Sequence, residues 1–371
     1  MSEPTDTDGT IQAPTDQPAP PASTAPGTPF GAPEDQLPWE HVAPPPVQSD
    51  HGLAYRIGLA LFRGSRRFIG VLIALIVMMA IFTFTQDRFL TIDNMTLIVR
   101  SMSVLFMVSI GNTFVLLTAG FDLSVGSMLS FAGVLLAFMI GANFDPWLAM
   151  GLTMLCTMAL GGLLNGTLIG FAGLSFFVVT LASLSLIRGI TFVWSQGFTK
   201  TVDSAAVAAV GDGKVFGISV SVIEILGVLL ISLFVLHFTR FGRAVYAVGG
   251  NREAARLSGI HVGAVIVAVY AISGLLAGFA GIIQTGRLGA AAPVAGTGIE
   301  LSAAAAVLLG GTSFSGGAGG VVGTLVGVMF IGTLRDGLGL SGVSAFWQDI
   351  VTGVILIAAI SVDRISRARG R

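Results

Sequence analysis

Long runs of apolar residues, separated by short polar segments, make up most of the chain after residue 67. A run of about 20 apolar residues can cross the roughly 30 Å hydrocarbon core of a bilayer as one helix. The run 146–187, at about 40 residues, is long enough for two spans that turn near 170–175. Further spans are predicted at 68–86, 101–121, 123–144, 219–237 and 262–286, with three more at 298–362, broken at 315–320 and 335–344. This pattern predicts an all-α integral membrane protein, a polytopic bundle of about ten transmembrane helices with at least one broken helix.

Composition supports the same fold class. The mean hydropathy is +0.87 and only 11% of the residues are charged. A water-soluble core of 371 residues does not use so much apolar sequence, so much of the chain must face lipid. Glycines recur every fourth residue at 162–170 and at 319–327. Such stripes let membrane helices pack closely, whatever the protein transports.

The first 50 residues differ from the rest. They hold 12 of the 14 prolines and eight acidic side chains, with no Lys or Arg. A segment of this kind buries too little apolar surface to offset the entropy lost on ordering. We predict a disordered, Pro-rich, acidic cytoplasmic tail at 1–52, a transmembrane domain at 53–365 and a basic cytoplasmic carboxyl terminus at 366–371. The tail lacks the ordered regions of a signal peptide. A solvating extension is its simplest role, and a ligand for an adaptor is the alternative.

Basic side chains gather in three segments that ten spans would place on one side of the membrane. These are Arg56, Arg63, Arg66 and Arg67; Arg240, Arg243, Arg252 and Arg256; and Arg364, Arg367, Arg369 and Arg371, which make 12 of the 19 basic residues. Cytoplasmic loops carry an excess of Lys and Arg, so both termini and the loop 239–262 are predicted to be cytoplasmic.

A carboxylate stands between two apolar runs in GFDLSVGS, residues 120–127. An ionised Asp122 inside a bilayer costs about 2.5 to 3.5 kcal/mol, so it needs a partner or a water-filled cavity. One hypothesis is structural: Asp122 caps a helix that begins at Leu123, and Ser124 satisfies other free amides. The other is functional: broken helix ends and these side chains face the transport path and bind a polyhydroxylated substrate. Asn165 is a third candidate, although such a residue more often bonds a neighbouring helix.

The segment 241–261, FGRAVYAVGGNREAARLSGIH, is polar and rich in arginine. Asn251 is expected to cap a short helix at 252–258, and Gly259 to close it in a left-handed conformation. Glu253 and Arg256 suit the two poles of such a helix. Small Ala254 and Ala255 would allow close approach by a partner protein. An ordinary surface helix between two spans is the alternative.

Several chemistries lack a signature in this sequence. No phosphate-binding G-x-x-x-x-G-K-[ST] loop surrounds either lysine, so ATP binding of that kind is not expected. Cys156 is the only cysteine, and the four histidines show no metal-ligand spacing. We expect no catalytic residues, no cofactor, no metal and no nucleic-acid partner.

Four motifs in order carry a family resemblance. They are LTAGFDLSVGSMLSFAG (117–133), NGTLIGFAGLSFFVVTLASLSLIRGITFVWSQG (165–197), FGRAVYAVGGNREAARLSGI (241–260) and LLGGTSFSGGAGGVVGTLVG (308–327). Over about residues 60–365 the chain resembles the permease subunits of bacterial ribose, xylose, arabinose and galactoside ATP-binding-cassette (ABC) importers. It departs from them in its long tail and in LSFFVVTL, where many relatives carry a proline.

The resemblance implies a multi-pass protein of the bacterial cytoplasmic membrane that imports a monosaccharide. It implies a second permease copy, a separate ABC ATPase subunit and an extracytoplasmic sugar-binding protein. It also implies that residues 249–259 couple the permease to the ATPase, through Gly249, Gly250, Asn251, Glu253, Ala254, Ala255, Arg256 and Gly259. Asp122, Ser124 and Asn165 are the candidates for the translocation path.

Three alternatives remain open at this stage. An ABC permease for branched-chain amino acids or nucleosides would share the architecture but is less expected to carry GFDLSVGS. An ion-coupled secondary transporter would want several intramembrane carboxylates, and only Asp122 clearly qualifies. A purely structural membrane scaffold would leave the arginine-rich segment and the broken helix unexplained.

Overall fold

The computed structural model describes residues 65–368, and most of that region is helical. The helices are α2 (Ser65–Thr85), α3 (Ile92–Leu117), α4 (Val125–Gly141), α5 (Pro146–Ala159), the π-helix η2 (Leu160–Gly166), α6 (Thr167–Gly170), α7 (Phe176–Ser195), α8 (Ala205–Asp212), α9 (Val220–Phe238), α10 (Arg240–Gly250), α11 (Arg252–Leu257), α12 (Val262–Leu288), α13 (Ile299–Leu309), α14 (Val321–Leu340) and α15 (Ala345–Ala368). The predicted tail at 1–52 and residues 369–371 lie outside the described residues.

Four strands of two residues each make small pairings between helices. They are β1 (Lys200–Thr201), β2 (Lys214–Val215), β3 (Ile218–Ser219) and β4 (Ala290–Ala291). The pairs β1–β4 and β2–β3 are both antiparallel. The first of them ties the loop after α7 to the end of α12.

Each predicted span coincides with one apolar helix of the described region. Six helices there are long and apolar enough to cross a membrane: α3, α5–η2–α6 taken together, α7, α9, α12 and α14. Four shorter apolar helices, Ile69–Thr85, Val125–Gly141, Ile299–Leu309 and Ala345–Ser361, match the other predicted spans. The fold class, an all-α polytopic membrane protein, is therefore confirmed.

Two boundary predictions at the carboxyl-terminal end were wrong. Helix α13 has 11 residues, about 16 Å at 1.5 Å per residue, so it is half a span instead of a full one. Helix α14 continues through Arg335 to Leu340, although a break was predicted to begin at Arg335. The helix tolerates that charge because Asp349 and Ser302 bind the guanidinium group, at 3.1 and 2.9 Å.

Helices α3 and α12 form the centre of the bundle. Helix α12 packs against α3, α4, α5, η2 and α8. Every residue of α3 from Met102 to Leu117 is buried. By contrast α7 and α9 expose many large apolar side chains, as expected for helices that face lipid.

Glycines let the neighbours of α12 approach it closely, as the four-residue spacing predicted. A Cβ added at Gly166 or Gly170 would overlap the backbone of α12 at Val267 or Gly263. From the other side, a Cβ at Gly274 of α12 would overlap the carbonyl group of Thr157. Helices α5, η2 and α6 therefore pack on α12 backbone to backbone.

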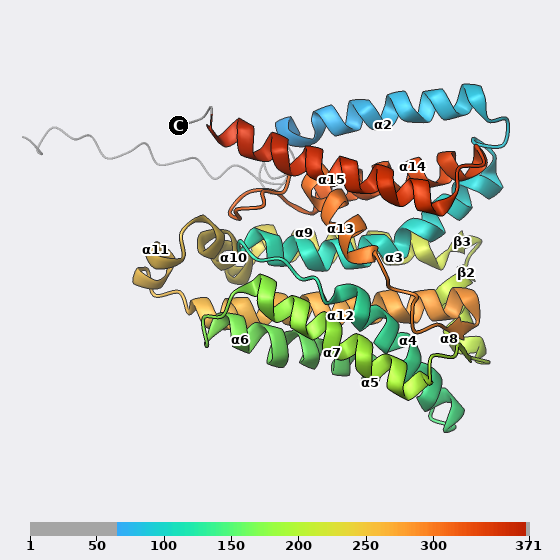
Figure 1. Cartoon of the computed structure of the whole chain (residues 1–371), viewed down its shortest axis with the longest axis horizontal. Coiled ribbons are helices and arrows are strands. Elements are labelled where there is room, and N and C mark those ends of the chain that lie inside the picture. Colours follow the sequence, from blue (N-terminus) through green and yellow to red (C-terminus); the bar gives the residue numbers. More distant parts are fainter. Residues whose placement is uncertain (1–64, 369–371) are drawn as a thin grey trace, which may run out of the picture. The chain divides into compact units, whose positions relative to one another are not determined.

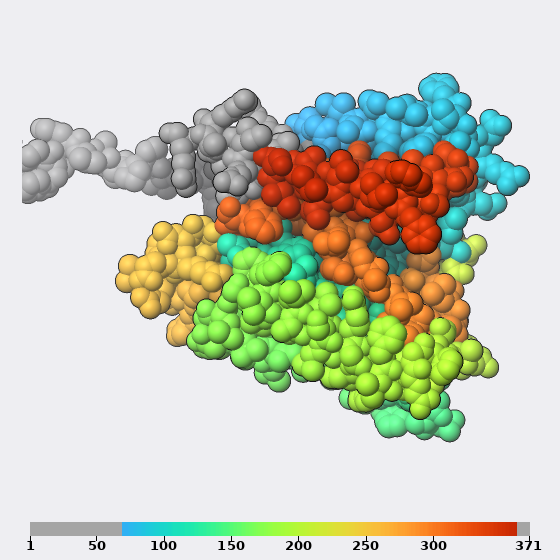
Figure 2. Space-filling view, viewed as in Figure 1, coloured from blue at the N-terminus to red at the C-terminus, as the bar shows by residue number. Residues whose placement is uncertain are grey.

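The two ends of the bundle carry different structures. Helix α12 begins next to α11 and, at roughly 40 Å long, ends next to α8. In Figure 1, α10 and α11 lie at the left end, and α8, β2 and β3 lie at the right end. The space-filling view shows α10 and α11, coloured gold, projecting at that left end (Figure 2).

Candidate functional site

The three predicted translocation-path residues lie together in the fold. Ser124 donates its hydroxyl to the Asp122 carboxylate at 2.5 Å, and the Asn165 amide donates to the Ser124 hydroxyl at 2.8 Å. All three side chains are fully buried. The fold thus brings Ser124 and Asn165, which are 41 positions apart in the sequence, into direct contact. Their contact with a transported solute stays a prediction.

Asp122 satisfies amides and hydroxyls where the chain is broken between α3 and α4. Its carboxylate accepts the Ser124 amide at 3.0 Å and the Ser273 hydroxyl of α12 at 2.9 Å. Its own amide donates to the side-chain oxygen of Asn112 on α3, at 3.2 Å. The capping prediction was wrong in its register, because α4 begins at Val125 with Ser124 as the N-cap residue. Asp122 instead stabilises the turn before the helix.

Asn165 enters this cluster from a π-helix. The segment Leu160–Gly166 inserts a wider turn between α5 and α6. Asn165 there accepts a hydrogen bond from the Ser183 hydroxyl of α7 at 2.5 Å, while its amide donates to Ser124. Such π-helical turns are rare and often occur at functional sites. The side chain therefore links α7 to the break before α4.

Sequence reasoning missed three members of this cluster: Asn112, Ser183 and Ser273. Each is a polar residue in a largely apolar helix and is buried in the fold. Polar side chains in membrane helices often bond one another across helices, so their presence in apolar runs was the available signal. The pairing itself could not be predicted from the sequence, because it depends on how five segments pack: α3, the turn before α4, η2, α7 and α12.

The second candidate site, residues 249–259, forms the predicted short helix. Asn251 caps α11 by accepting the amides of Glu253 and Ala254, both at 3.0 Å. Glu253 and Arg256 form an exposed ion pair at 2.7 Å. Gly259 has a φ of +82°, the left-handed conformation expected after the helix.

The two alanines of α11 face different surroundings. Ala255 is only 5% exposed because its own chain covers it, whereas Ala254 is exposed. Leu257 is 79% exposed. Ala254 and Leu257, rather than both alanines, are therefore available to a partner protein.

The end of α10 contacts both breaks of the bundle: the first break, residues 118–124 between α3 and α4, and the second break, residues 310–320 between α13 and α14. Gly249 lies so close to them that an added Cβ would overlap the Leu117 carbonyl oxygen and crowd the Gly317 amide. That amide donates to the Leu117 carbonyl at 3.0 Å, which joins the two breaks directly. Arg252 of α11 donates to the Thr118 carbonyl at 3.3 Å. The three motifs 117–133, 241–260 and 308–327 therefore converge on one point.

Tyr246 of α10 adds a side-chain link to the second break. Its hydroxyl donates to the Gly319 carbonyl at 2.9 Å. Burial raises the pKa of Tyr246 to about 12, so the hydroxyl keeps its proton and its role as donor.

Residues 94–360 match the model of a family described as branched-chain amino acid transport system / permease component. The chain belongs to this family of permeases. The permease is 41% identical to the ribose import permease of Escherichia coli strain K12 over 298 residues, which covers 79% of this chain and 92% of the relative. The ribose import permease of Bacillus subtilis strain 168 is 41% identical over 305 residues, 82% of this chain and 94% of the relative. The D-allose transport system permease of E. coli K12 is 39% identical over 297 residues, 80% and 91% of the two chains. No solved structure matches the permease.

These comparisons confirm the resemblance expected from the four motifs. The matched range of the permease includes both candidate sites, the Asp122 cluster and α10–α11. The permease is a transport subunit of the membrane, in keeping with its apolar helices.

Proposed function

We propose that this chain is the transmembrane permease subunit of an ABC importer that carries a monosaccharide of the pentose or hexose class across the cytoplasmic membrane of a bacterium. The observation that carries the proposal is its 41% identity to ribose import permeases over most of both chains. A third relative, at 39%, is named for D-allose, a hexose. The transported class is thus a monosaccharide, and not the branched-chain amino acid of the family description.

A separate ABC ATPase supplies the energy and docks on α11. The exposed Leu257 supports this role, because the buried core of an interface is more apolar and less charged than the rest of the surface, and the small Ala254 beside it allows close approach. The contacts of α10 and α11 with both breaks provide a path from the docking site into the bundle.

This docking site lies on the cytoplasmic side together with both termini. Arg240, Arg243, Arg252 and Arg256 lie on α10 and α11, and cytoplasmic segments carry such an excess of Arg. An extracytoplasmic sugar-binding protein then delivers the solute at the other end of the bundle, next to α8. A second permease copy completes the channel.

Uptake in cells tests the proposal. The permease is expressed together with the ABC ATPase and the sugar-binding protein of its own importer, in a host without its own ribose, allose and xylose importers. Radiolabelled ribose, allose, xylose and leucine are supplied one at a time. We expect uptake of at least one sugar and none of leucine. Uptake of leucine without any sugar would assign the permease to branched-chain amino acids.

A further inference from the structure

A cavity of about 610 Å³ opens at the end of the bundle opposite α11. Its walls are the first half of α3, the end of α12, the segment before α13 and the second half of α14. This volume lies within the roughly 300 to 1,000 Å³ of small-molecule sites. The cavity does not include Asp122, Ser124 or Asn165, so it is separate from the buried cluster described above.

Polar side chains stand on three walls of this cavity. They are Asn94 and Ser101 of α3, Gln284 and Arg287 of α12, and Arg335 and Asp336 of α14. The Asn94 amide holds one oxygen of the Asp336 carboxylate at 2.8 Å, which leaves the other oxygen able to accept. Gln284 makes no side-chain hydrogen bond with the described residues, so both its donor and its acceptor are available.

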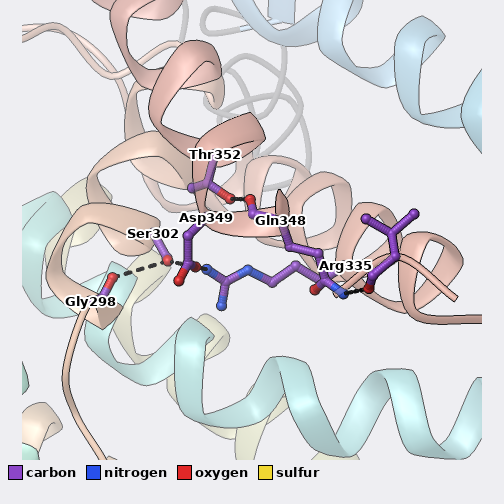
Figure 3. Close-up of polar contacts among 7 residues, drawn as sticks. Gly298, Ser302, Arg335, Gln348, Asp349 and Thr352 are labelled. Carbon is purple, nitrogen blue, oxygen red and sulfur yellow. Dashed lines mark hydrogen bonds and ion pairs between the residues drawn. The ribbon is translucent and has the colours of Figure 1, made fainter. Parts of the chain in front are cut away.

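The charge of Arg335 is already neutralised. Its guanidinium group pairs with Asp349 of α15 at 3.1 Å and donates to Ser302 of α13 at 2.9 Å. Figure 3 shows Arg335 reaching between these two side chains, with Ser302 bonded in turn to the Gly298 carbonyl. Arg335 therefore fixes α13, α14 and α15 around the cavity and contributes little net charge to it.

Arg287 differs from Arg335 in that no carboxylate of the described residues forms an ion pair with it. It donates to the Arg100 carbonyl at 2.8 Å. Arg100 itself pairs with Asp212 of α8 at 2.7 Å. Helix α8 is held there by glycine contact, because a Cβ at Gly211 or Gly286 would overlap the backbone of the other helix. The wall that carries Arg287 and Gln284 is thus held in place.

We propose that this cavity is a binding site for a neutral, polyhydroxylated solute entering from the end opposite α11, which deepens the monosaccharide import proposed above and rests on it. Arg287 and Gln284 donate to solute oxygens, and the free oxygen of Asp336 accepts from a hydroxyl. Among the described residues of the lining, the cation of Arg287 balances the carboxylate of Asp336, and this balance suits an uncharged ligand. Leu97, Val104 and Leu105 provide apolar wall for the carbon–hydrogen face of a sugar ring.

Thiol labelling in the complete importer tests the site. Ser101 is exposed and lines the cavity, so Ser101→Cys, in a chain whose Cys156 is replaced by serine, reports on access to it. A membrane-impermeant methanethiosulfonate is applied alone, with whichever of ribose, allose and xylose the parent importer takes up, and with leucine. At a concentration about nine times Kd, mass action predicts labelling about tenfold slower. Lys214→Cys, exposed at the same end but outside the cavity, should show no such protection and controls for cover by the docked binding protein.

Two variants, Asp336→Asn and Gln284→Leu, each combined with the Ser101→Cys reporter, test whether these side chains hold the sugar in the cavity. Each should remove most of the sugar protection of the reporter thiol while the labelling rate without sugar stays unchanged. Leu97→Cys, one turn away, replaces the reporter if Ser101→Cys does not assemble. Suppose that the importer with the reporter still transports the sugar but its thiol is labelled at the same rate with and without sugar. That result would overturn the site and leave the proposed function intact. Protection by leucine but not by any sugar would overturn the assignment to a polyhydroxylated solute, and the uptake panel would then fail as well.

Discussion

The two breaks in the bundle, residues 118–124 and 310–320, face the same physical problem and are built differently. Both interrupt helices and leave backbone amides and carbonyls without helical partners. The first break is almost fully buried, and side chains satisfy it: Asp122 accepts the Ser124 amide, and Asn112 accepts that of Asp122. The second is half-buried and rich in glycine, and its backbone groups bond one another.

The second break differs from the first because it holds side-chain hydroxyls that make no hydrogen bond with the described residues. Thr312 Oγ1 and Ser313 Oγ of the second break are buried and find no partner in the described part of the chain. Its glycines instead adopt left-handed conformations, with φ of +80° at Gly316 and +70° at Gly317, and fit against Ala119 and Gly250. The first break should therefore respond to changes in hydrogen bonding, and the second to changes in side-chain volume.

The largest expected effect comes from adding volume where α10 meets both breaks. Gly249→Ala places a methyl group against the Leu117 carbonyl and the Gly317 amide, and such overpacking costs about 1–3 kcal/mol or more. We expect a lower thermal unfolding temperature of the purified permease and loss of uptake. Gly250→Ala is the matched control, since nothing lies within 4 Å of its Cβ position, and it should change stability by less than about 1 kcal/mol. Equal effects at both positions would remove the steric account of this contact.

An intermediate effect is expected from the hydrogen bonds of the first break. Asp122→Ala leaves the Ser124 amide and two buried hydroxyls without their acceptor, a cost of about 1–3 kcal/mol. Asp122→Asn keeps one oxygen for the Ser124 amide and should unfold between the parent and the alanine variant, with modestly reduced uptake. An asparagine variant that assembles and unfolds like the parent but imports nothing would show that transport needs the charge itself.

The smallest effect concerns Tyr246, whose side chain supports the second break. Tyr246→Phe removes a hydrogen bond to the Gly319 carbonyl, worth about 0.5–1.5 kcal/mol, and leaves the ring in place. Thermal unfolding should shift slightly, and uptake should stay near the parental rate. A loss as large as that of Asp122→Ala would mean that the second break also depends on side-chain bonds.

Local features of the fold could be predicted from the sequence. Apolar length located the apolar helices but not α8 or α10, and the capping residues Asn251 and Gly259 gave α11 to within a residue. These features depend on neighbours in the chain. The half-length of α13 could not be predicted, because the apolar run before Gly310 looks the same whether or not the helix crosses the membrane.

The candidate sites could be predicted only in part. Asp122 and Ser124 bond each other within one turn, whereas Asn165, which lies in η2, reaches Ser124 only through the packing of η2 beside that turn. The burial of Ala255 and the exposure of Leu257 depend on where α11 lies against its own bundle. The cavity at the other end involves α3, α12 and α14, which are far apart in the sequence.

A pull-down tests the docking of the ATPase on α11. Ala254→Glu puts a carboxylate on the exposed side of α11, where docking would bury it without a partner, at a cost of about 1–3 kcal/mol or more. Ala254→Ser serves as the matched small variant, and Ala255→Glu should instead destabilise the permease itself. The measurement is co-purification of the ATPase with each permease, alongside sugar uptake in the same cells. We expect Ala254→Glu to yield a folded permease that loses its ATPase and its uptake, while Ala254→Ser keeps both. An Ala254→Glu permease that retains its ATPase and transports at the parental rate would contradict docking on α11.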